Sequence, residues 1–393
     1  MRSNRQIVRN GIYKGILAML MLGAAAGVHA GDCPADISNL PAGQWCEVPN
    51  SHMRSVAYQW PSGVTFTQNG IGVDGVMSLW SGGAFDSKRN RLIVWGGGHF
   101  GYAGNEIYAF DANTLSWTRV TNPSIPVGEN TPYAPDGGPT SRHTYNYVDY
   151  VPSIDRFCSF GGAGFYSDGQ HGTDTTDCFD FDGLKWEKKA TIPNTGPTTI
   201  GSKAVYDPTS GKVYLQTGLG GTFSSYDPGT DTWATLVSSS FMDYNITAAI
   251  DPVRRKMVAV GIGQLLVLDL KNPSAGFANL SAGGDLAIFN ATSPGFVYDP
   301  VSDRFVGWSG GSDVFTLNMD TLMWSKLPLA AGNSTTPTAA SSDGTYGRFR
   351  YIPSKNAFVV VNGIDENVFF YKLSTAAGIP PPAQAAKPTV TVH

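Results

Sequence analysis

Arg91-Leu-Ile-Val-Trp-Gly-Gly-Gly-His-Phe-Gly-Tyr-Ala-Gly-Asn-Glu-Ile-Tyr-Ala-Phe-Asp111 is a pattern that the rest of the chain repeats. β-Branched and aromatic residues, typical of a strand, lead into three glycines and a polar loop that contains His99. A second strand is predicted from Asn105 to Asp111, and Trp117 begins a third. The same order returns along the chain, which predicts a repeat architecture.

Five complete four-stranded units are predicted, at 76–120, 143–189, 204–236, 247–280 and 295–327, with first strands of the first two units at 76–85 and 143–151. Equivalent places in the fourth strands are held by Trp117, Trp186, Trp233, Phe277 and Trp324. A sixth unit has strands near 345–352, 357–362 and 367–373 but no fourth strand. Gly43-Gln-Trp45-Cys-Glu-Val-Pro49 looks like the missing strand. We therefore expect an all-β propeller of six blades, closed by an N-terminal strand that completes the last blade. Residues 52–74 are surplus to the pattern, and either cap one face or hold the strands of a seventh blade.

Paired glycines after the second strand and a tryptophan in the fourth resemble the kelch-repeat β-propeller family, the architecture of the central domain of galactose oxidase. The pairs are Gly96-Gly97, Gly161-Gly162, Gly220-Gly221 and Gly310-Gly311, while the fourth and sixth units keep only Gly261 and Gly363. The resemblance covers about 75–375 and the N-terminal strand. It implies a fold and says little about function, because propellers support oxidases, lyases, hydrolases and binding platforms.

The first thirty residues differ from the repeats. Four cations precede an apolar run at 16–28 that ends in Val28-His29-Ala30, which predicts a secretory signal peptide at 1–30. An uncleaved anchor is the alternative, although the run is short for a membrane span. Loss of the four cations lowers the formal net charge from −4 to −8, which argues against a nucleic-acid partner. We expect a secreted or periplasmic monomer without a membrane span after cleavage, with a propeller at 31–374 and a flexible Pro/Ala-rich tail at 375–393.

Four cysteines, an even number in an exported chain, indicate disulfide bonds. Cys158 and Cys178 fall on neighbouring predicted strands, so we expect the pairs Cys158–Cys178 and Cys33–Cys46. Free buried thiols are the alternative, and the spacing does not resemble a zinc site.

Candidate site residues gather at one face of the predicted ring. Because strands alternate in direction within a blade, the loop after the second strand and the start of the first strand open on the same face. That face receives His99 and Tyr102 from the first blade and Arg142, His143, Tyr145 and Asn146 from the second. His171 falls on the same face, further out.

An alignment of the first strands on Asp86, Pro152, Asp207, Asp251, Asp299 and Pro353 adds further candidates. It places Tyr145, Tyr244 and Tyr346 in one register, with Asn146 and Asn245 one residue on and Arg348 two residues beyond Tyr346. Each group also has an ordinary structural explanation. The histidine of a kelch repeat often packs within its blade, tyrosines pack between blades, and buried arginines tie loops to carbonyl or carboxylate oxygens.

These residue types suit polysaccharide cleavage by β-elimination. A uronic-acid substrate needs a cation or donor at its carboxylate, and it needs a base and an acid at C5 and the leaving oxygen. Arg142 or Arg348 is expected at the carboxylate, His99 and His143 in proton transfer or charge neutralisation, and Tyr145 or Tyr244 as acid or base. Tyr102, Asn146 and Asn245 are expected to bind substrate. The set is similar in residue types to the sites of propeller polysaccharide lyases such as the ulvan lyases.

Two alternatives remain open. A glycan- or protein-binding propeller without catalysis would use the same aromatic and amide groups. A copper radical oxidase would need two histidines, two tyrosines and a cysteine crosslinked to one tyrosine, and the expected disulfides leave no such cysteine. We expect no catalytic cofactor, and leave open whether a structural Ca²⁺ binds in the channel.

Overall fold

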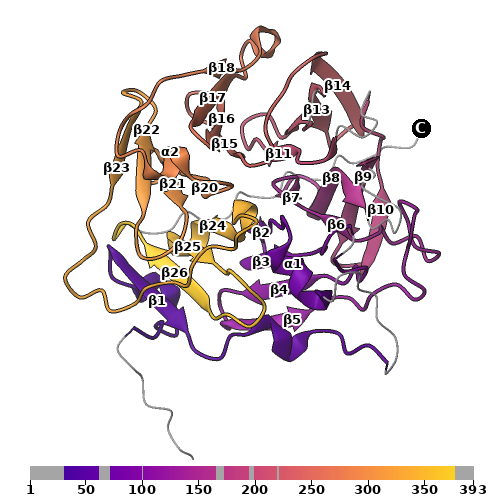
Figure 1. The fold of residues 1–393 in the computed structure, drawn as a ribbon, viewed down its shortest axis with the longest axis horizontal. Helices are drawn as coiled ribbons and strands as arrows, with labels where there is room; N and C mark the ends of the chain where they lie inside the picture. The colour runs from indigo at the N-terminus through magenta and orange to yellow at the C-terminus, as the bar shows by residue number, and fades with distance from the viewer. Residues whose placement is uncertain are drawn as a thin grey trace, which may run out of the picture. The chain divides into compact units, whose positions relative to one another are not determined.

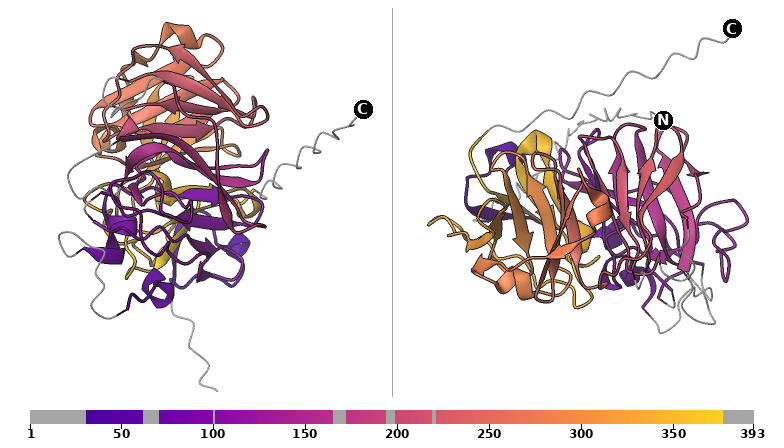
Figure 2. Two further views of the ribbon diagram at one scale, coloured as in Figure 1. Left: turned by 90° about the vertical axis from the view of Figure 1, so that its right-hand side faces the viewer. Right: turned by 90° about the horizontal axis from the view of Figure 1, so that it is seen from above.

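The computed structural model describes residues 31–61, 71–99, 101–164, 172–193, 199–218 and 221–376. Six small sheets of antiparallel strands form a ring (Figure 1). Seen edge-on, the strands of neighbouring sheets run side by side (Figure 2). The structure therefore confirms the six-bladed β-propeller, and the described residues form no seventh sheet. The predicted signal peptide at 1–30 and residues 377–393 of the predicted tail lie outside the described residues.

In the first three blades, the strands lie side by side in the order in which they occur along the chain. Blade 1 holds β2 (Ala84–Asp86), β3 (Arg91–Val94), β4 (Tyr108–Asp111) and β5 (Ser116–Arg119). Blade 2 holds β6 (Arg142–His143), β7 (Val148–Val151), β8 (Arg156–Gly164), β9 (Gly172–Asp180) and β10 (Lys185–Lys188). Blade 3 holds β11 (Lys203–Tyr206), β12 (Val213–Gln216), β13 (Phe223–Asp227) and β14 (Thr232–Val237).

The last three blades complete the ring. Blade 4 holds β15 (Thr247–Asp251), β16 (Lys256–Gly261), β17 (Gln264–Asp269) and β18 (Ala278–Asn279). Blade 5 holds β20 (Gly295–Asp299), β21 (Arg304–Trp308), β22 (Phe315–Asn318) and β23 (Met323–Lys326), with β19 (Gly283–Gly284) parallel to β23. Blade 6 holds β24 (Phe349–Ile352), β25 (Ala357–Val360), β26 (Val368–Lys372) and the N-terminal β1 (Gln44–Val48).

Strand β1 closes the ring as the sequence predicts. It pairs antiparallel with β26, with Trp45 opposite Tyr371 and Glu47 opposite Phe369. The Trp45 indole is 2% exposed, packs 5.0 Å from Tyr371 between ring centroids, and donates through Nε1 to the Ser312 carbonyl. The Cys33–Cys46 disulfide holds the preceding segment to β1. N-terminal and C-terminal strands are thus joined in one blade, and β26 has a hydrogen-bonded neighbour on both sides.

The first strands of the blades line the centre of the ring. They contact one another in the order β2, β7, β11, β15, β20 and β24, and β24 contacts β2. The sequence predicts a strand over 76–85, but residues Gly75–Ser78 form helix α1 and only Ala84–Asp86 is a strand. The surplus segment forms the 3-10 helices η2 (Met53–Val56) and η3 (Gly72–Asp74), of which η2 packs beside β5. Among the described residues, no helix has the length and apolar character needed to cross a membrane.

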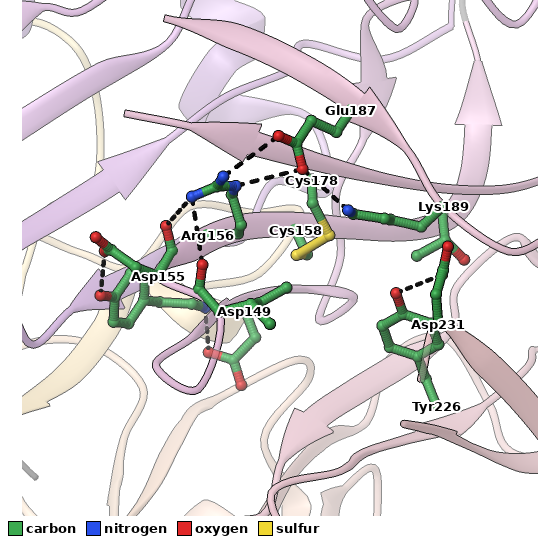
Figure 3. Close-up of a disulfide and its surroundings, with 12 residues drawn as sticks. Asp149, Asp155, Arg156, Cys158, Cys178, Glu187, Lys189, Tyr226 and Asp231 are labelled. Carbon is green, nitrogen blue, oxygen red and sulfur yellow. Dashed lines mark hydrogen bonds and ion pairs between the residues drawn. A yellow bond between two sulfur atoms is a disulfide. The ribbon is translucent and has the colours of Figure 1, made fainter. Parts of the chain in front are cut away.

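Both predicted disulfides are confirmed. Cys158 on β8 lies directly opposite Cys178 on β9, and their Cα atoms are 4.1 Å apart. Figure 3 shows this bond with Arg156 and Lys189 both paired to Glu187 nearby, at 3.3 Å and 2.9 Å. The bond therefore links the two longest strands of blade 2, the blade that also supplies His143 and Tyr145.

Candidate functional site at one mouth of the central channel

The histidines predicted to act together do meet. His99 follows β3 and His143 ends β6, and their ring centroids lie 4.5 Å apart in an edge-to-face arrangement. Glycine makes this approach feasible, because a Cβ on Gly98 would lie 1.9 Å from Nδ1 of His143. Gly98 also has φ +80°, which disfavours any side chain. The glycine run of the repeat therefore brings the His99 loop onto the histidine of the next blade.

His143 is a buried, neutral imidazole with a fixed tautomer. Its Nδ1 lies 2.8 Å from the Leu79 carbonyl oxygen, which can only accept, so Nδ1 carries the proton and Nε2 does not. Burial lowers the pKa of His143 to about 3, and the charge of His99 adds to the effect. Burial lowers the pKa of the half-buried His99 to about 4. Both rings are uncharged at neutral pH in the free protein.

Tyr145 lies at the centre of the cluster. Its ring centroid is 6.0 Å from that of His143, 6.4 Å from that of Tyr244 and 5.9 Å from that of Tyr346. Its ring is buried, yet its hydroxyl has no hydrogen-bond partner among the described residues. Burial raises the pKa of Tyr145, so the phenol keeps its proton at neutral pH. The predicted set of His99, His143, Tyr145 and Tyr244 is therefore one continuous group.

Tyr244 and Tyr346 differ in exposure. Tyr346 is fully buried and donates from its hydroxyl to the Tyr244 carbonyl at 3.0 Å. Tyr244 is 37% exposed, so it is the most solvent-accessible of the three tyrosines.

The alignment that groups the three tyrosines is wrong by one residue for Tyr244. The turn after each first strand ends in a residue with positive φ, namely Asn90, Asp155, Gly211, Arg255, Asp303 and Asn356. Counting back ten residues from these gives Trp80, Tyr145, Gly201, Asn245, Ser293 and Tyr346, and all of them except Asn245 have positive φ. Tyr145 and Tyr346 are therefore equivalent, and Tyr244 precedes the equivalent position. The shift explains why Tyr244 alone of the three is exposed.

The two arginines expected at a substrate carboxylate are buried and bonded to the protein. Arg142 pairs with Asp177 at 2.8 Å and donates to the Gly161 carbonyl, while its buried Nε has no hydrogen-bond partner among the described residues. Arg348 is fully buried and donates to the carbonyl oxygens of Met77, Ser81, Gly344 and Val361. Both hold loops together, which is the ordinary explanation given above, and neither exposes its guanidinium to solvent.

Other predicted binding residues also serve the fold. Tyr102 is buried, donates to Glu106 Oε1 at 2.5 Å and accepts from Trp60 Nε1 at 3.0 Å. Asn146 is buried, and its Oδ1 accepts from the backbone N–H of Ala248 at 2.8 Å, which ties blade 2 to blade 4. Asn245 is half-buried beside Tyr244. His171 lies outside the described residues.

Two charged residues near the mouth escape sequence analysis. Lys203 on β11 is fully buried, and its Nζ donates to the carbonyl oxygens of Gly201 and Asp243, each at 2.5 Å. Burial lowers the pKa of Lys203 to about 7. Asp343 is half-buried and contributes to the raised pKa of Tyr145. A lysine directly before the predicted unit at 204–236 and an aspartate in a Ser/Asp/Gly loop carry no motif that would mark them.

The described residues contain no group of three or more His, Cys, Asp or Glu side chains that could hold a metal ion. No protein-family model matches the chain, and no curated protein matches it. Among solved structures, the chain is similar to the one titled "Structure of YjhT", with a TM-score of 0.48 and 13% identity over 75% of this chain and 93% of that one. At that level the similarity says nothing about activity.

Proposed function

We propose that this chain is a secreted or periplasmic kelch-type propeller that cleaves a uronic-acid polysaccharide by β-elimination at this mouth. The observation that carries the proposal is the continuous group of two neutral imidazoles and the phenol of Tyr145, whose hydroxyl has no hydrogen-bond partner in the described part of the chain. Its support in the rest of the chain is indirect. Two disulfides suit an oxidising compartment, and the signal-like residues 1–30 suit export.

The histidines supply charge neutralisation in this proposal. A carboxylate bound within about 4–6 Å of an imidazole raises its pKa by about 1–3 units. Raised by this amount from about 4, the pKa of His99 allows the ring to take up a proton when the uronate binds at mildly acidic pH, and the resulting cation offsets the carboxylate charge. This replaces the role first expected of Arg142 and Arg348, whose guanidinium groups are fully buried.

The phenols supply proton transfer. The C5 proton becomes removable once the carboxylate is neutralised, and the leaving oxygen needs a proton in the same step. We assign the base to His143, whose unprotonated Nε2 takes the C5 proton as the C4–O bond breaks and the C4–C5 double bond forms. Tyr145 holds a proton at neutral pH because burial raises its pKa, so it gives that proton to the leaving oxygen and recovers one from His143 before the next turnover. Tyr244 is the exposed phenol that substrate meets.

A binding protein without catalysis is the second candidate, and one observation favours it. Arg142 and Arg348 are both fully buried, so neither provides an exposed permanent cation, the group that would most lower the barrier to C5 deprotonation. A different observation argues against a copper radical oxidase. All four cysteines are in disulfides, so none is available for a crosslink to tyrosine.

The two candidates separate in one assay. The purified protein is incubated with a panel of polyuronates, and the absorbance of the unsaturated product is followed. His99→Ala, Tyr145→Phe and Tyr244→Phe should each lower the rate at least about 100-fold if the groups act as assigned. Binding by the wild type without product on every substrate would contradict the lyase and leave the binding protein.

Proton uptake tests the role of His99 even without turnover. Because the free imidazole has a pKa of about 4, uronate affinity should weaken as the pH rises above that value, until the pKa of the bound form is passed. Calorimetry in buffers of different ionisation enthalpy measures the proton taken up. His99→Gln should abolish the uptake, and unchanged uptake in that variant would rule out the assignment.

A further inference from the structure

A second cleft lies away from the channel, between blades 1 and 2. Its volume is about 450 Å³, and its walls include Asn105, Asn122, Leu184, Lys185, Trp186 and Lys188. Strand β10 supplies Lys185, Trp186 and Lys188, and the segment after β5 supplies the opposite wall. The cleft is thus built by the outer strand of one blade and a long loop of its neighbour.

Trp186 differs from the other fourth-strand tryptophans in the combination of how far its ring is buried and what its Nε1 contacts. Trp45, Trp117 and Trp324 are buried, and the half-buried Trp233 donates from Nε1 to the Ala190 carbonyl at 3.0 Å. Trp186 is half-buried, and its Nε1 has no acceptor among the described residues. Its ring is nevertheless fixed, with centroids 5.2 Å from Trp95 and 5.4 Å from Phe179. The cleft therefore contains a rigid indole with a spare N–H donor.

The lining of the cleft includes the two cations of Lys185 and Lys188 and one carboxylate, that of Asp136, so positive charge is in excess there although the protein is acidic. Lys185 and Lys188 are exposed, and neither forms an ion pair with a described residue. The Nζ of Lys188 sits 3.5 Å from the ring centroid of Tyr133, which holds the ammonium in place. Leu184 beside them is 60% exposed, a large apolar side chain left open at the cleft.

Hydrogen bonds within the protein hold the opposite wall of the cleft in place. The Asn105 amide donates to Ser124 Oγ at 2.9 Å and to the Pro139 carbonyl, and its Oδ1 accepts from the Ser124 N–H. Asp136 accepts from Ser124 Oγ at 2.9 Å. A polar wall held rigid in this way loses little entropy when a ligand binds.

We propose that this cleft binds an anionic oligosaccharide. The Trp186 indole and Leu184 receive the apolar face of a sugar ring, and Lys185 and Lys188 pair with its carboxylate or sulfate groups. The choice of an acidic glycan as ligand rests on the proposed function. The site itself is independent of the channel chemistry, and it would hold a second stretch of the polymer that the channel mouth receives.

Binding to immobilised polygalacturonate, with dextran as the neutral glycan, tests the proposal. Lys185→Gln/Lys188→Gln should weaken retention on polygalacturonate about tenfold, since the loss of one exposed ion pair lowers an affinity at most about fivefold. Retention on dextran should stay unchanged. The matched control is Lys212→Gln/Lys271→Gln, which removes the same charge from blades 3 and 4, and it should bind almost as the wild type does.

Two results would overturn the proposal. Equal weakening in both double variants would show a general charge effect, and wild-type retention in Lys185→Gln/Lys188→Gln would show that the cleft is not used. A protein with no lyase activity at all can still give the expected binding result. In His99→Ala, cleft binding should persist, so failure of the channel assignment and failure of the cleft assignment remain distinguishable.

Discussion

Arg348 shows how a single buried cation can organise the mouth without touching substrate. Its guanidinium gathers carbonyl oxygens from residues 77 and 81 of the first blade and from residues 344 and 361 of the last. Burial lowers the pKa of Arg348 to about 10, so it remains charged at neutral pH. The residue thus joins the two blades at the seam on the same side as the candidate site.

We expect Arg348→Met to destabilise the protein by about 3 kcal/mol or more, because several buried carbonyl oxygens lose their donors. Urea unfolding measures the change. Arg304→Met is the control, since Arg304 is half-buried and donates to the Asp303 carbonyl, and it should cost less than about 1 kcal/mol. Similar costs for the two variants would show that Arg348 does not hold the seam.

Lys203 makes stability depend on pH. Its pKa is about 7 in the folded protein and 10.5 in the unfolded chain, so between these values the unfolded chain binds more protons. The burial penalty is therefore complete below pH 7 and disappears as the pH rises toward 10.5. Between pH 7 and pH 10, the free energy of unfolding of the wild type should rise by about 3 kcal/mol relative to that of Lys203→Met. Parallel stability profiles for the two proteins over that range would contradict the shifted pKa.

At the scale of elements, the loop between β3 and β4 decides where the two histidines meet. Gly98 combines φ +80° with a Cβ position 1.9 Å from Nδ1 of His143. Gly211 has a similar φ of +71°, but a Cβ there would touch nothing within 4 Å. A comparison of substitutions at Gly98 and Gly211 therefore separates the effect of backbone strain from the effect of displacing His143.

Gly98→Ala should lower the free energy of unfolding more than Gly211→Ala does, because Gly211→Ala adds only backbone strain of about 1 kcal/mol. The added methyl must move either the loop or the His143 ring, so we expect about 2–3 kcal/mol and a changed imidazole NMR signal for His143. Gly211→Ala should leave that signal in place. An unchanged signal in Gly98→Ala would mean that the loop moves without the histidine.

The same elements show how far sequence alone reaches. Gly96-Gly97 and Trp117 recur with enough regularity to predict the blades, the closing strand and both disulfides. The register of Tyr244 is not predictable in this way, because Pro152 looks equivalent to Asp251 although Val151 holds that place. The roles of Arg142 and Arg348 depend on which carbonyl and carboxylate groups approach from other blades, and that information is not local in sequence.

At the scale of the molecule, the ring depends on one short strand. Each blade packs on two neighbours, and only blade 6 takes strands from both ends of the chain. If β1 were absent, β26 would present the apolar strand Val368–Lys372 as an open edge. An exposed apolar edge is a template for pairing with another chain.

A chain that begins at Pro49 should therefore self-associate, and light scattering coupled to size-exclusion chromatography measures its mass. Cys33→Ser/Cys46→Ser is the control, because it keeps β1 and loses only the disulfide across a separation of 13 residues. That variant should stay at the wild-type mass and lose about 3 kcal/mol of stability. A shortened chain of wild-type mass and stability would show that the ring does not need β1. If Cys33→Ser/Cys46→Ser also self-associates, the Cys33–Cys46 disulfide is needed to keep β1 paired with β26.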